Sequence, residues 1–429
     1  MVTLAAEKVY GQSQFKRGSF SPVRIDVLTK EYPPEIYGGA GVHVAELVRA
    51  LRRRPDLEVQ VHAFGGPREE KLTSSYPDLA ELADANPALK TLGVDLTMAD
   101  GCAGTEVAHS HTWYANMAGH LASLLYGVPH VVSAHSLEPL RPWKAEQLGG
   151  GYAVSSWVEK TAYEAAAAVI AVSAAMRDDV LAAYPSIDPA RVHVVHNGID
   201  TDAWAPKDDP DRVRELGVDP DRPSVVFVGR ITRQKGLPLF LRAVAQLPPE
   251  VQIVLCAGAP DTPEIEAEVV ELVNGLKQSR DGVVWIREML PRPDVVALLT
   301  AATAFVCPSI YEPLGIVNLE AMACETAVVA TATGGIPEVV VDPSTGSGRA
   351  ATGRLVPIEQ ATDGTGTPLN PDQYVADFAA ALNEVVSDPE RAAEMGRAGR
   401  QRAIEDFSWE AIAERTVEVY RSVLAERGR

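Results

Sequence analysis

Two glutamates, Glu312 and Glu320, are the residues whose type and spacing first indicate a binding chemistry, with seven residues between them. They lie in residues 308–324, PSIYEPLGIVNLEAMAC, a stretch that turns through a proline and a glycine and then has the pattern of a helix apolar on both sides. Such a helix is typical of a protein interior. A carboxylate on it needs a hydrogen-bonding partner, because an unpaired buried charge is costly. The pair therefore favours a ligand with hydroxyl donors over two surface charges.

Groups that bind an anion are predicted at the start of the same helix and on a loop earlier in the chain. The backbone N–H groups of Leu314, Gly315 and Ile316 have no partner within the helix, and a helix start attracts anions. Arg230 and Lys235 follow an apolar strand, five positions apart, which suits a diphosphate clamp with arginine as a fork and lysine as a point charge. Singly, each is typical of a solvated surface group. Together with the glutamates, they predict a site for a nucleotide-sugar.

The first half of the chain offers weaker candidates. Gly38 and Gly39 lie in a glycine-rich turn between a strand and a helix, an arrangement in which backbone can approach a phosphate closely. The turn is not the dinucleotide fingerprint and no Walker lysine follows it. His135 ends a predicted strand, where a lone histidine is more often a core residue. His109 and His111 have no third ligand at a recognisable spacing, so no metal site is expected.

Composition excludes several classes of protein. The chain has 429 residues, 46% of them hydrophobic and 23% charged, as in ordinary soluble proteins, and its formal net charge is −19. Nucleic acid and anionic membranes both require a broad basic face, so neither is expected as a partner. No apolar run approaches the roughly 18 residues that span a bilayer. The four cysteines form no CxxC pair and are interpreted as reduced core residues of a cytoplasmic protein: Cys102, Cys256, Cys307 and Cys324.

Alternating strand and helix patterns predict two parallel sheets with helices on both faces, and ligands at the carboxyl ends of the strands. Residues 1–20 are expected to be a loose extension, and a polar stretch, 201–223, is a plausible linker between two α/β domains. The predicted strands are 23–28, 58–64, 107–109, 130–134, 169–172 and 192–196 in the first domain and 224–229, 252–257, 283–286, 304–307, 328–331 and 354–356 in the second.

On these residues the chain resembles the retaining nucleotide-sugar glycosyltransferases of the GT-B fold, in the group that includes glycogen synthases. The resemblance extends from Val23 to the last helix, and the segment LTKEYPPEIYGGAGVHV is similar to the actinobacterial branch of that group. Its motifs are the Glu-x7-Glu signature at 312–320, Arg230 and Lys235 within GRITRQKGL, the Gly38-Gly39 turn, His135 after a strand, and HNGID at 196–200.

The resemblance implies an α/β fold of GT-B type, with two Rossmann-like, doubly wound parallel sheets facing across a cleft. Residues 21–205 would form an N-terminal acceptor-side domain, completed by a C-terminal helix, 406–429, that crosses back to it. Residues 206–405 would form the domain that binds the nucleotide-sugar.

The resemblance also implies roles for the donor-side residues. Arg230 and Lys235 would neutralise the diphosphate as ADP leaves, and the backbone of 314–316 would donate to the phosphates or the sugar. Glu312 would hold hydroxyls of the transferred sugar, and Glu320 those of the ribose.

From the other domain, Gly38 and Gly39 would close onto the phosphates and His135 would line the donor sugar at the reacting carbon. Many relatives carry a lysine just before the glycine pair, whereas this chain has a tyrosine. The aromatic residues expected on the acceptor side are Tyr37, Trp113 and Tyr114.

The activity that the resemblance implies is α-1,4 glucosyl transfer from ADP-glucose to glucose 1-phosphate, giving maltose 1-phosphate, or to a glucan end. Retention without an evident nucleophile implies attack on the same face, assisted by the leaving phosphate, so no metal or other cofactor is required. Four alternatives stay open: a lipid acceptor, a small-sugar acceptor, a sugar-nucleotide epimerase on the same fold, and a nucleotide-binding protein without catalytic activity. A homodimer is possible.

Overall fold

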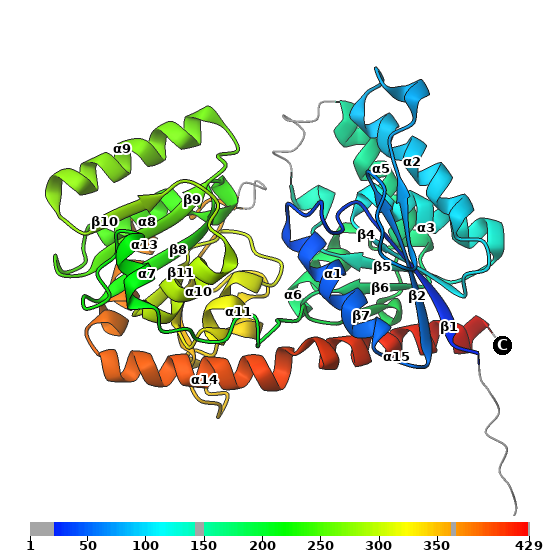
Figure 1. Cartoon of the computed structure of the whole chain (residues 1–429). Coiled ribbons are helices and arrows are strands. Elements are labelled where there is room, and N and C mark those ends of the chain that lie inside the picture. The colour runs from blue at the N-terminus through cyan, green and yellow to red at the C-terminus, as the bar shows by residue number, and fades with distance from the viewer. Residues whose placement is uncertain (1–20, 142–149, 362–365, 428–429) are drawn as a thin grey trace, which may run out of the picture.

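The computed structural model describes residues 21–141, 150–361 and 366–427, and these form two α/β lobes (Figure 1). The first lobe is built on a seven-stranded sheet in the order β3-β2-β1-β4-β5-β6-β7, and the second on a six-stranded sheet in the order β10-β9-β8-β11-β12-β13. The named strands pair in parallel, as at β1–β4 and β8–β9. The predicted fold class is therefore confirmed, whereas the predicted extension, residues 1–20, lies outside the described residues.

The elements of the first lobe follow the predicted alternation of strand and helix. Its strands are β1 (Val23–Thr29), β2 (Leu57–Phe64), β3 (Thr73–Tyr76), β4 (Val107–His111), β5 (His130–Ala134), β6 (Ala168–Ala171) and β7 (Val192–Val194). Its helices are α1 (Gly39–Arg52), α2 (Pro87–Gly101), α3 (Trp113–Tyr126), α5 (Gly150–Ala165) and α6 (Ala174–Ala183). Sequence reasoning missed β3 and α2. The segment of β3, TSSY, has no apolar alternation, whereas α2 carried a usable signal in its Asn86 cap and the proline that follows.

The second lobe also alternates, and two long helices end the chain. Its strands are β8 (Ser224–Arg230), β9 (Gln252–Gly258), β10 (Val283–Ile286), β11 (Ala304–Cys307), β12 (Ala327–Thr331) and β13 (Gly353–Val356). The helices are α7 (Pro210–Glu215), α8 (Leu237–Val244), α9 (Pro263–Ser279), α10 (Arg292–Ala301), α11 (Ile316–Ala323), α12 (Ile336–Val339), α13 (Pro371–Val386), α14 (Pro389–Phe407) and α15 (Trp409–Arg427).

Helices cover both faces of the first sheet. Successive side chains of a strand point to opposite faces, so apolar residues on both faces are buried by these helices. On one face, Ile25 of β1 belongs to a buried cluster with Leu47 of α1 and Ile412 of α15. On the other face, Leu28 of the same strand packs in a cluster with Met98 of α2. A parallel strand covered on both sides is mostly apolar, and these apolar runs made most of the strands predictable from the sequence.

The second sheet repeats this plan, and one of its clusters continues into the first lobe. Val225 of β8 faces the side of α8 and α13, while Val226 faces the side of α10 and α11. The cluster around Val226 also contains Tyr163 and Met176, which belong to the first lobe. The lobes therefore share packed apolar surface. The four cysteines are buried and free, as predicted.

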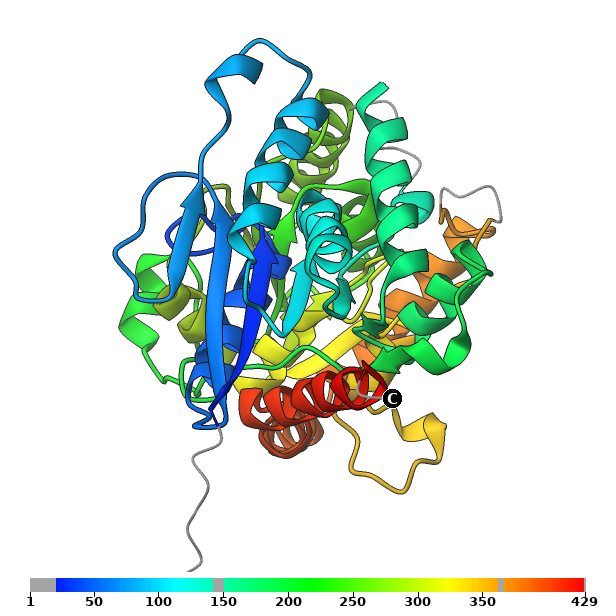
Figure 2. The same ribbon diagram turned by 90° about the vertical axis from the view of Figure 1, so that its right-hand side faces the viewer.

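The chain passes between the lobes twice, and the two crossings are hydrogen-bonded to each other. The first crossing follows β7, and the second joins α14 to α15 at Ser408. The backbone N–H of Ile199 donates to the carbonyl oxygen of Phe407 at 2.8 Å, and Ile199 and Ser408 form a parallel bridge. Helices α14 and α15 follow one another along one side of both lobes (Figures 1 and 2). Trp409 at the start of α15 packs in the core of the first lobe.

The contact between Gly198 and Trp409 generates a test of this junction. A Cβ atom at Gly198 would lie 2.6 Å from the ring of Trp409, so Gly198→Ala must displace the indole. We expect the substitution to lower the free energy of unfolding by about 1–3 kcal/mol, the usual cost of overpacking. Urea unfolding of the parent and the variant measures this difference.

Gly275 of α9 provides the matched control, because a Cβ atom there meets nothing within 4 Å. Gly275→Ala should raise stability by about 0.5–1 kcal/mol through helix propensity. A Gly198→Ala variant that unfolds like the parent would contradict the described packing at the crossing.

Candidate active site

The start of α11 is shaped by a glycine in the left-handed region. Gly315 caps the helix with φ +91°, and a Cβ atom there would lie 2.5 Å from the side-chain nitrogen of Asn318. The backbone from Leu314 to Ile316 therefore turns sharply into a helix that is buried along one side by residues such as Leu319 and Met322. A helix therefore begins where the sequence predicts an anion to bind, after the loop that follows β11.

Glu312 precedes this helix start and is 8% exposed. Its Oε2 accepts from the Nζ of Lys235 at 2.6 Å and from the hydroxyl of Ser309 at 3.1 Å. Burial by itself would lower the pKa of Lys235, but the Glu312 carboxylate outweighs burial and the pKa of the ammonium is raised. Lys235 and Glu312, which the sequence predicts as site residues from separate segments, thus form one ion pair. It joins the loop after β8 to the turn before α11.

Arg230 ends β8 on the same loop and has a more open position. Its side chain is 60% exposed and lies 3.2 Å from a carboxylate oxygen of Asp261. Lys235 is fixed more tightly, since the hydroxyl of Thr232 accepts from its backbone N–H at 3.2 Å. Both cations thus stand at the carboxyl end of one strand. Lys235 is paired with Glu312, whereas Arg230 is accessible to solvent.

Glu320 lies one turn into α11, beside a narrow cavity of about 20 Å³ between the lobes. The first lobe contributes Val42, Glu46, Gly198, Ile199 and Asp200, and Trp204, Arg292, Ile316 and Trp409 complete the lining. Burial raises the pKa of Glu320 to about 7, although the charges of Arg292 and Lys235 oppose this shift. A carboxyl group that titrates near neutrality is suited to accept hydroxyl hydrogen bonds once it is ionised.

The Gly38-Gly39 turn touches the second lobe, but one of its donors already has a partner. A Cβ atom on Gly39 would lie 3.8 Å from the side chain of Ile316. The Oε2 of Glu31 accepts from the backbone N–H of Tyr37 at 3.0 Å and from that of Gly38 at 2.7 Å. Glu31 therefore occupies the N-terminal end of α1, where the sequence predicts that Gly38 and Gly39 contact a phosphate. Sequence reasoning missed this carboxylate.

His135 follows β5 and is part of a histidine cluster. Its Nε2 lies 2.9 Å from the Nδ1 of His111, and its ring meets that of His43 edge-on with centroids 4.8 Å apart. Burial lowers the pKa of His135 to about 4. Near pH 7 its imidazole is therefore neutral and can accept a proton or a hydrogen bond.

The third histidine of this cluster was not predicted, because His43 comes from α1, far from His111 in the sequence. One ligand atom from each of His43, His111 and His135 lies within 4.8 Å of the others, so the geometry brings together three possible metal ligands where the sequence predicted none. The hydrogen bond between His111 and His135 already uses one nitrogen of each ring. His109, the other histidine named from the sequence, bonds instead to Ser133 and Tyr420.

The three aromatic residues predicted on the acceptor side differ in exposure. Tyr37 is 63% exposed, whereas Trp113 is 5% exposed and packs with Met117 in a small core cluster. Tyr114 lies partly buried against Trp113, with ring centroids 4.3 Å apart. The Nζ of Lys30 stands 3.7 Å above the Tyr114 ring. Lys30 is thus a cation close to these residues, although no role is assigned to it from the sequence.

Contacts between the lobes adjoin the Glu312 turn. The hydroxyl of Ser173 donates to the carbonyl oxygen of Pro313 at 2.6 Å. Glu338 of α12 accepts from the backbone N–H groups of Ala174 and Ala175, at 2.9 and 3.2 Å, and lies 2.9 Å from the Nε2 of His196. A carboxylate of the second lobe thus caps a helix of the first.

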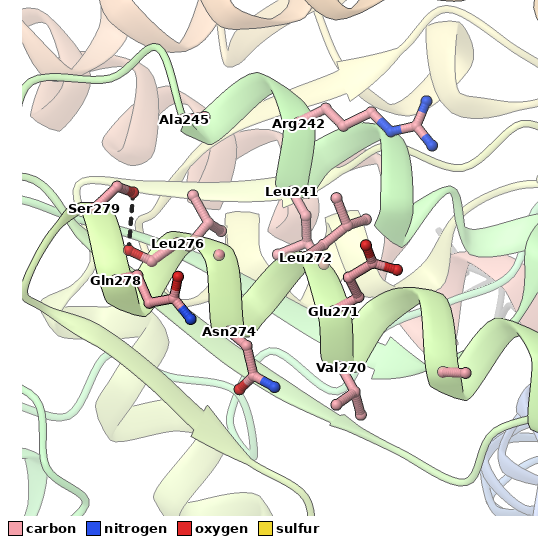
Figure 3. A pocket seen from close by; sticks show the side chains of 12 residues that line it. Leu241, Arg242, Ala245, Val270, Glu271, Leu272, Asn274, Leu276, Gln278 and Ser279 are labelled. Carbon is pink, nitrogen blue, oxygen red and sulfur yellow. Dashed lines mark hydrogen bonds between the residues drawn. The ribbon is translucent and has the colours of Figure 1, made fainter.

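A broad surface groove lies elsewhere and contains no predicted site residue. It measures about 960 Å³ and runs between α8 and α9 on the outside of the second lobe (Figure 3). Its walls include Leu241, Val270 and Leu276, and polar side chains such as Asn274 stand at its rim (Figure 3).

Comparison with known proteins matches two family models, Glycosyltransferase Family 4 over residues 37–203 and Glycosyl transferases group 1 over residues 208–402. An alpha-maltose-1-phosphate synthase of Mycolicibacterium smegmatis is 58% identical over 94% of this chain and 100% of its own length. A D-inositol 3-phosphate glycosyltransferase of Kineococcus radiotolerans is 31% identical over 91% of this chain and 92% of its own. Among solved structures, the catalytic domain of starch synthase IV from Arabidopsis thaliana covers 94% of this chain and 100% of its own at a TM-score of 0.74 and 18% identity.

Within the described ranges, no helix combines the length and the apolar character that crossing a membrane requires.

The raised pKa of Glu320 predicts a pH-dependent stability. Its folded-state pKa, about 7, exceeds the ordinary 4.5, so between these values the folded chain retains a proton that the unfolded chain has released. The contribution of Glu320 to stability should therefore fall as pH rises through this window and level off above it. Glu320→Gln lacks this titration. Urea unfolding from pH 5 to 8 measures the unfolding free energy of both proteins, and that of the parent should fall relative to that of the variant as pH rises. Parallel profiles would exclude the raised pKa.

Proposed function

Because the chain belongs to the glycosyltransferase family that includes the alpha-maltose-1-phosphate synthases, we propose that it transfers glucose from ADP-glucose to glucose 1-phosphate and forms maltose 1-phosphate. The observation that carries this proposal is the 58% identity over the full length of the mycobacterial synthase. The ion pair between Lys235 and Glu312 also supports the proposal, because it places a cation and a carboxylate beside a helix start that can bind an anion.

On the donor side, Arg230 and Lys235 bind the diphosphate, and the backbone from Leu314 to Ile316 adds hydrogen-bond donors. Arg230 is exposed enough to reach a ligand, and Lys235 lies where the turn before α11 meets β8. As ADP departs, its oxygen gains negative charge, and cations already in place stabilise that charge without reorganisation.

The two glutamates bind opposite ends of the donor in this proposal. Glu312 accepts hydrogen bonds from hydroxyls of the transferred glucose, with its orientation fixed by Lys235 and Ser309. Glu320, at the interface between the lobes, accepts hydrogen bonds from hydroxyls of the ribose. Neither carboxylate is required as a nucleophile.

From the first lobe, His135 lines the transferred sugar, and the Gly38-Gly39 turn closes over the phosphates. The O4 hydroxyl of the acceptor attacks the anomeric carbon, whose bond to the diphosphate oxygen breaks with the electron pair leaving on ADP. The hydroxyl proton passes to the departing phosphate on the same face. Neutral His135 is compatible with this path because it adds no charge beside the developing cation. No metal or other cofactor takes part.

In this proposal, each of the two lobes binds one of the substrates. Residues 21–205, together with 406–429, form the acceptor side, and 206–405 form the donor side. The proposed partners are small molecules, a nucleotide-sugar and a sugar phosphate, and the proposed compartment is the cytoplasm. A glucan end, or the inositol phosphate named in the 31% identical relative, is the alternative acceptor.

A donor-by-acceptor activity matrix with product identification tests this function. ADP-glucose with glucose 1-phosphate should release ADP and yield a phosphorylated disaccharide. Lys235→Met and Glu312→Gln should each lower kcat/KM by about a hundredfold or more, as loss of one preorganised charge-stabilising group does. Lys277→Met, on the exposed face of α9, is the matched control and should leave turnover intact. No turnover with any glucosyl donor would refute the function, and fully active site variants would refute only the residue assignment.

A further inference from the structure

We propose that His43, His111 and His135 bind a divalent transition-metal ion of the Zn²⁺ class, and that the bound ion inhibits the transferase. The binding of the metal is argued from the arrangement of the three imidazoles. Its inhibitory effect rests on the proposed function, in which His135 lines the transferred sugar.

The three rings come from three elements of the first lobe. His43 lies in α1, His111 ends β4, and His135 directly follows β5. Because β4 and β5 are adjacent and parallel, His111 and His135 leave the sheet at one edge. The ring centroid of His43 lies 4.8 Å from that of His135 and 5.7 Å from that of His111. A helix and two strand ends therefore fix the three rings, and rigid elements position metal ligands well.

The cluster has hydrogen-bonding capacity that no described residue uses. The Nδ1 of His43 and the Nε2 of His111 are buried without a hydrogen-bond partner among the described residues, and these two histidines are 3% and 0% exposed. Unpaired buried polar atoms are costly and rare, so two of them in one cluster favour a bound ligand. Each neutral ring has one lone pair, which either of its nitrogens can carry.

The spacing of His111 and His135 is close to that of two ligands on one metal ion. The Nδ1 of His111 lies 2.9 Å from the Nε2 of His135, and one ligand nitrogen of each of the three rings lies within 4.8 Å of the others. Two imidazole nitrogens on tetrahedral zinc, each about 2.0–2.1 Å from the metal, stand roughly 3.3 Å apart. Small ring rotations therefore bring the cluster to coordination distance, with each ring keeping its proton on the nitrogen that faces away from the ion.

The chemistry of the three ligands selects the class of metal. Imidazoles suit Zn²⁺, Cu²⁺ and Ni²⁺, whereas Mg²⁺ and Ca²⁺ prefer oxygen ligands. Only the neutral imidazole binds a metal, and burial lowers the pKa of all three rings, so they are neutral near pH 7. His135 is only partly buried, which leaves a side from which an ion can enter and a solvent molecule can fill the fourth position.

A second group of possible ligands in the described residues, Asp26, His62 and Cys102, has its hydrogen bonds already made. Arg24 donates to both carboxylate oxygens of Asp26 at 2.9 Å. The two ring nitrogens of His62 lie 2.9 Å from Asp26 and 2.7 Å from the hydroxyl of Tyr76. The thiol of Cys102 donates to a backbone carbonyl at 3.4 Å. A metal would have to break these bonds, so the first cluster is the better site.

Coordination of His135 explains how the ion would inhibit. The anomeric carbon of the donor gains positive charge as its bond to the diphosphate oxygen breaks. A dication held by the ring that lines this sugar repels that charge, whereas the neutral imidazole does not. The bound ion should therefore slow the transfer step.

Titration with Zn²⁺ alone tests the site without turnover. Calorimetry on protein without a histidine tag should show one Zn²⁺ per chain, and Co²⁺ should develop the visible absorption of a tetrahedral site. His43→Gln and His111→Gln should each weaken Zn²⁺ binding by about a hundredfold or more, because loss of a group that merely orients a ligand already costs roughly 10–100-fold. His193→Gln, a partly buried histidine of β7, is the matched control and should bind Zn²⁺ as the parent does. Circular dichroism verifies that each variant is folded. No Zn²⁺ binding by the parent, or unchanged binding in both cluster variants, would overturn the site.

The inhibitory effect is measured with ADP-glucose and glucose 1-phosphate at free Zn²⁺ concentrations set by a metal buffer. Zn²⁺ should slow the release of ADP by the parent, and half-inhibition of His43→Gln should require about tenfold more Zn²⁺ or more. Mg²⁺ at the same free concentrations should not inhibit. A parent that binds Zn²⁺ through these histidines and still turns over at its full rate would overturn the inhibitory role. A parent without turnover would refute the proposed function, and calorimetry would still decide the metal site.

Discussion

The ion pair between Lys235 and Glu312 is the interaction on which the arrangement of the second lobe depends. It ties the loop after β8 to the turn before α11, and that turn determines where the backbone donors of residues 314–316 point. A buried ion pair is weak evidence for stability, because removing two charges from water costs about as much as their attraction returns. In the proposed function, its role is to bind the donor. The carboxylate and the ammonium are held close, and each retains capacity to bond a sugar hydroxyl or a phosphate oxygen.

The two lobes face each other with different electrostatics. The second presents cations and a carboxyl group that titrates near neutrality, whereas the first presents buried imidazoles whose pKa values burial has lowered. A neutral surface opposite a charged one suits a reaction in which negative charge must build up on one side only, at the leaving diphosphate.

The sequence predicted the alternating sheets and the helix of Glu312 and Glu320 because these depend on local signals: apolar strands buried on both faces, and a glycine before an apolar helix. It also placed Arg230 and Lys235 at a strand end. It did not predict His43 beside His135, Glu31 on the Gly38 N–H, or Glu338 on α6. Each of these contacts joins segments by packing between elements, and no spacing in the chain encodes it. The neutrality of His135 likewise comes from burial, which a strand-end histidine does not reveal.

The bonded pair of crossings at Ile199 and Ser408 restricts how the lobes can move. Two backbone segments that cross side by side favour rotation about their common line over sliding of one lobe past the other. A rotation that separated the lobes would also break the contacts of Glu338 with α6 and of Ser173 with Pro313. Glu320 lines a cavity together with Gly198, Ile199 and Trp409, and so lies close to the axis, where displacement is smallest. Groups farther from the axis separate in proportion to their distance. A group bound beside Glu320 would therefore be displaced less by such a rotation than a group bound farther from the crossings.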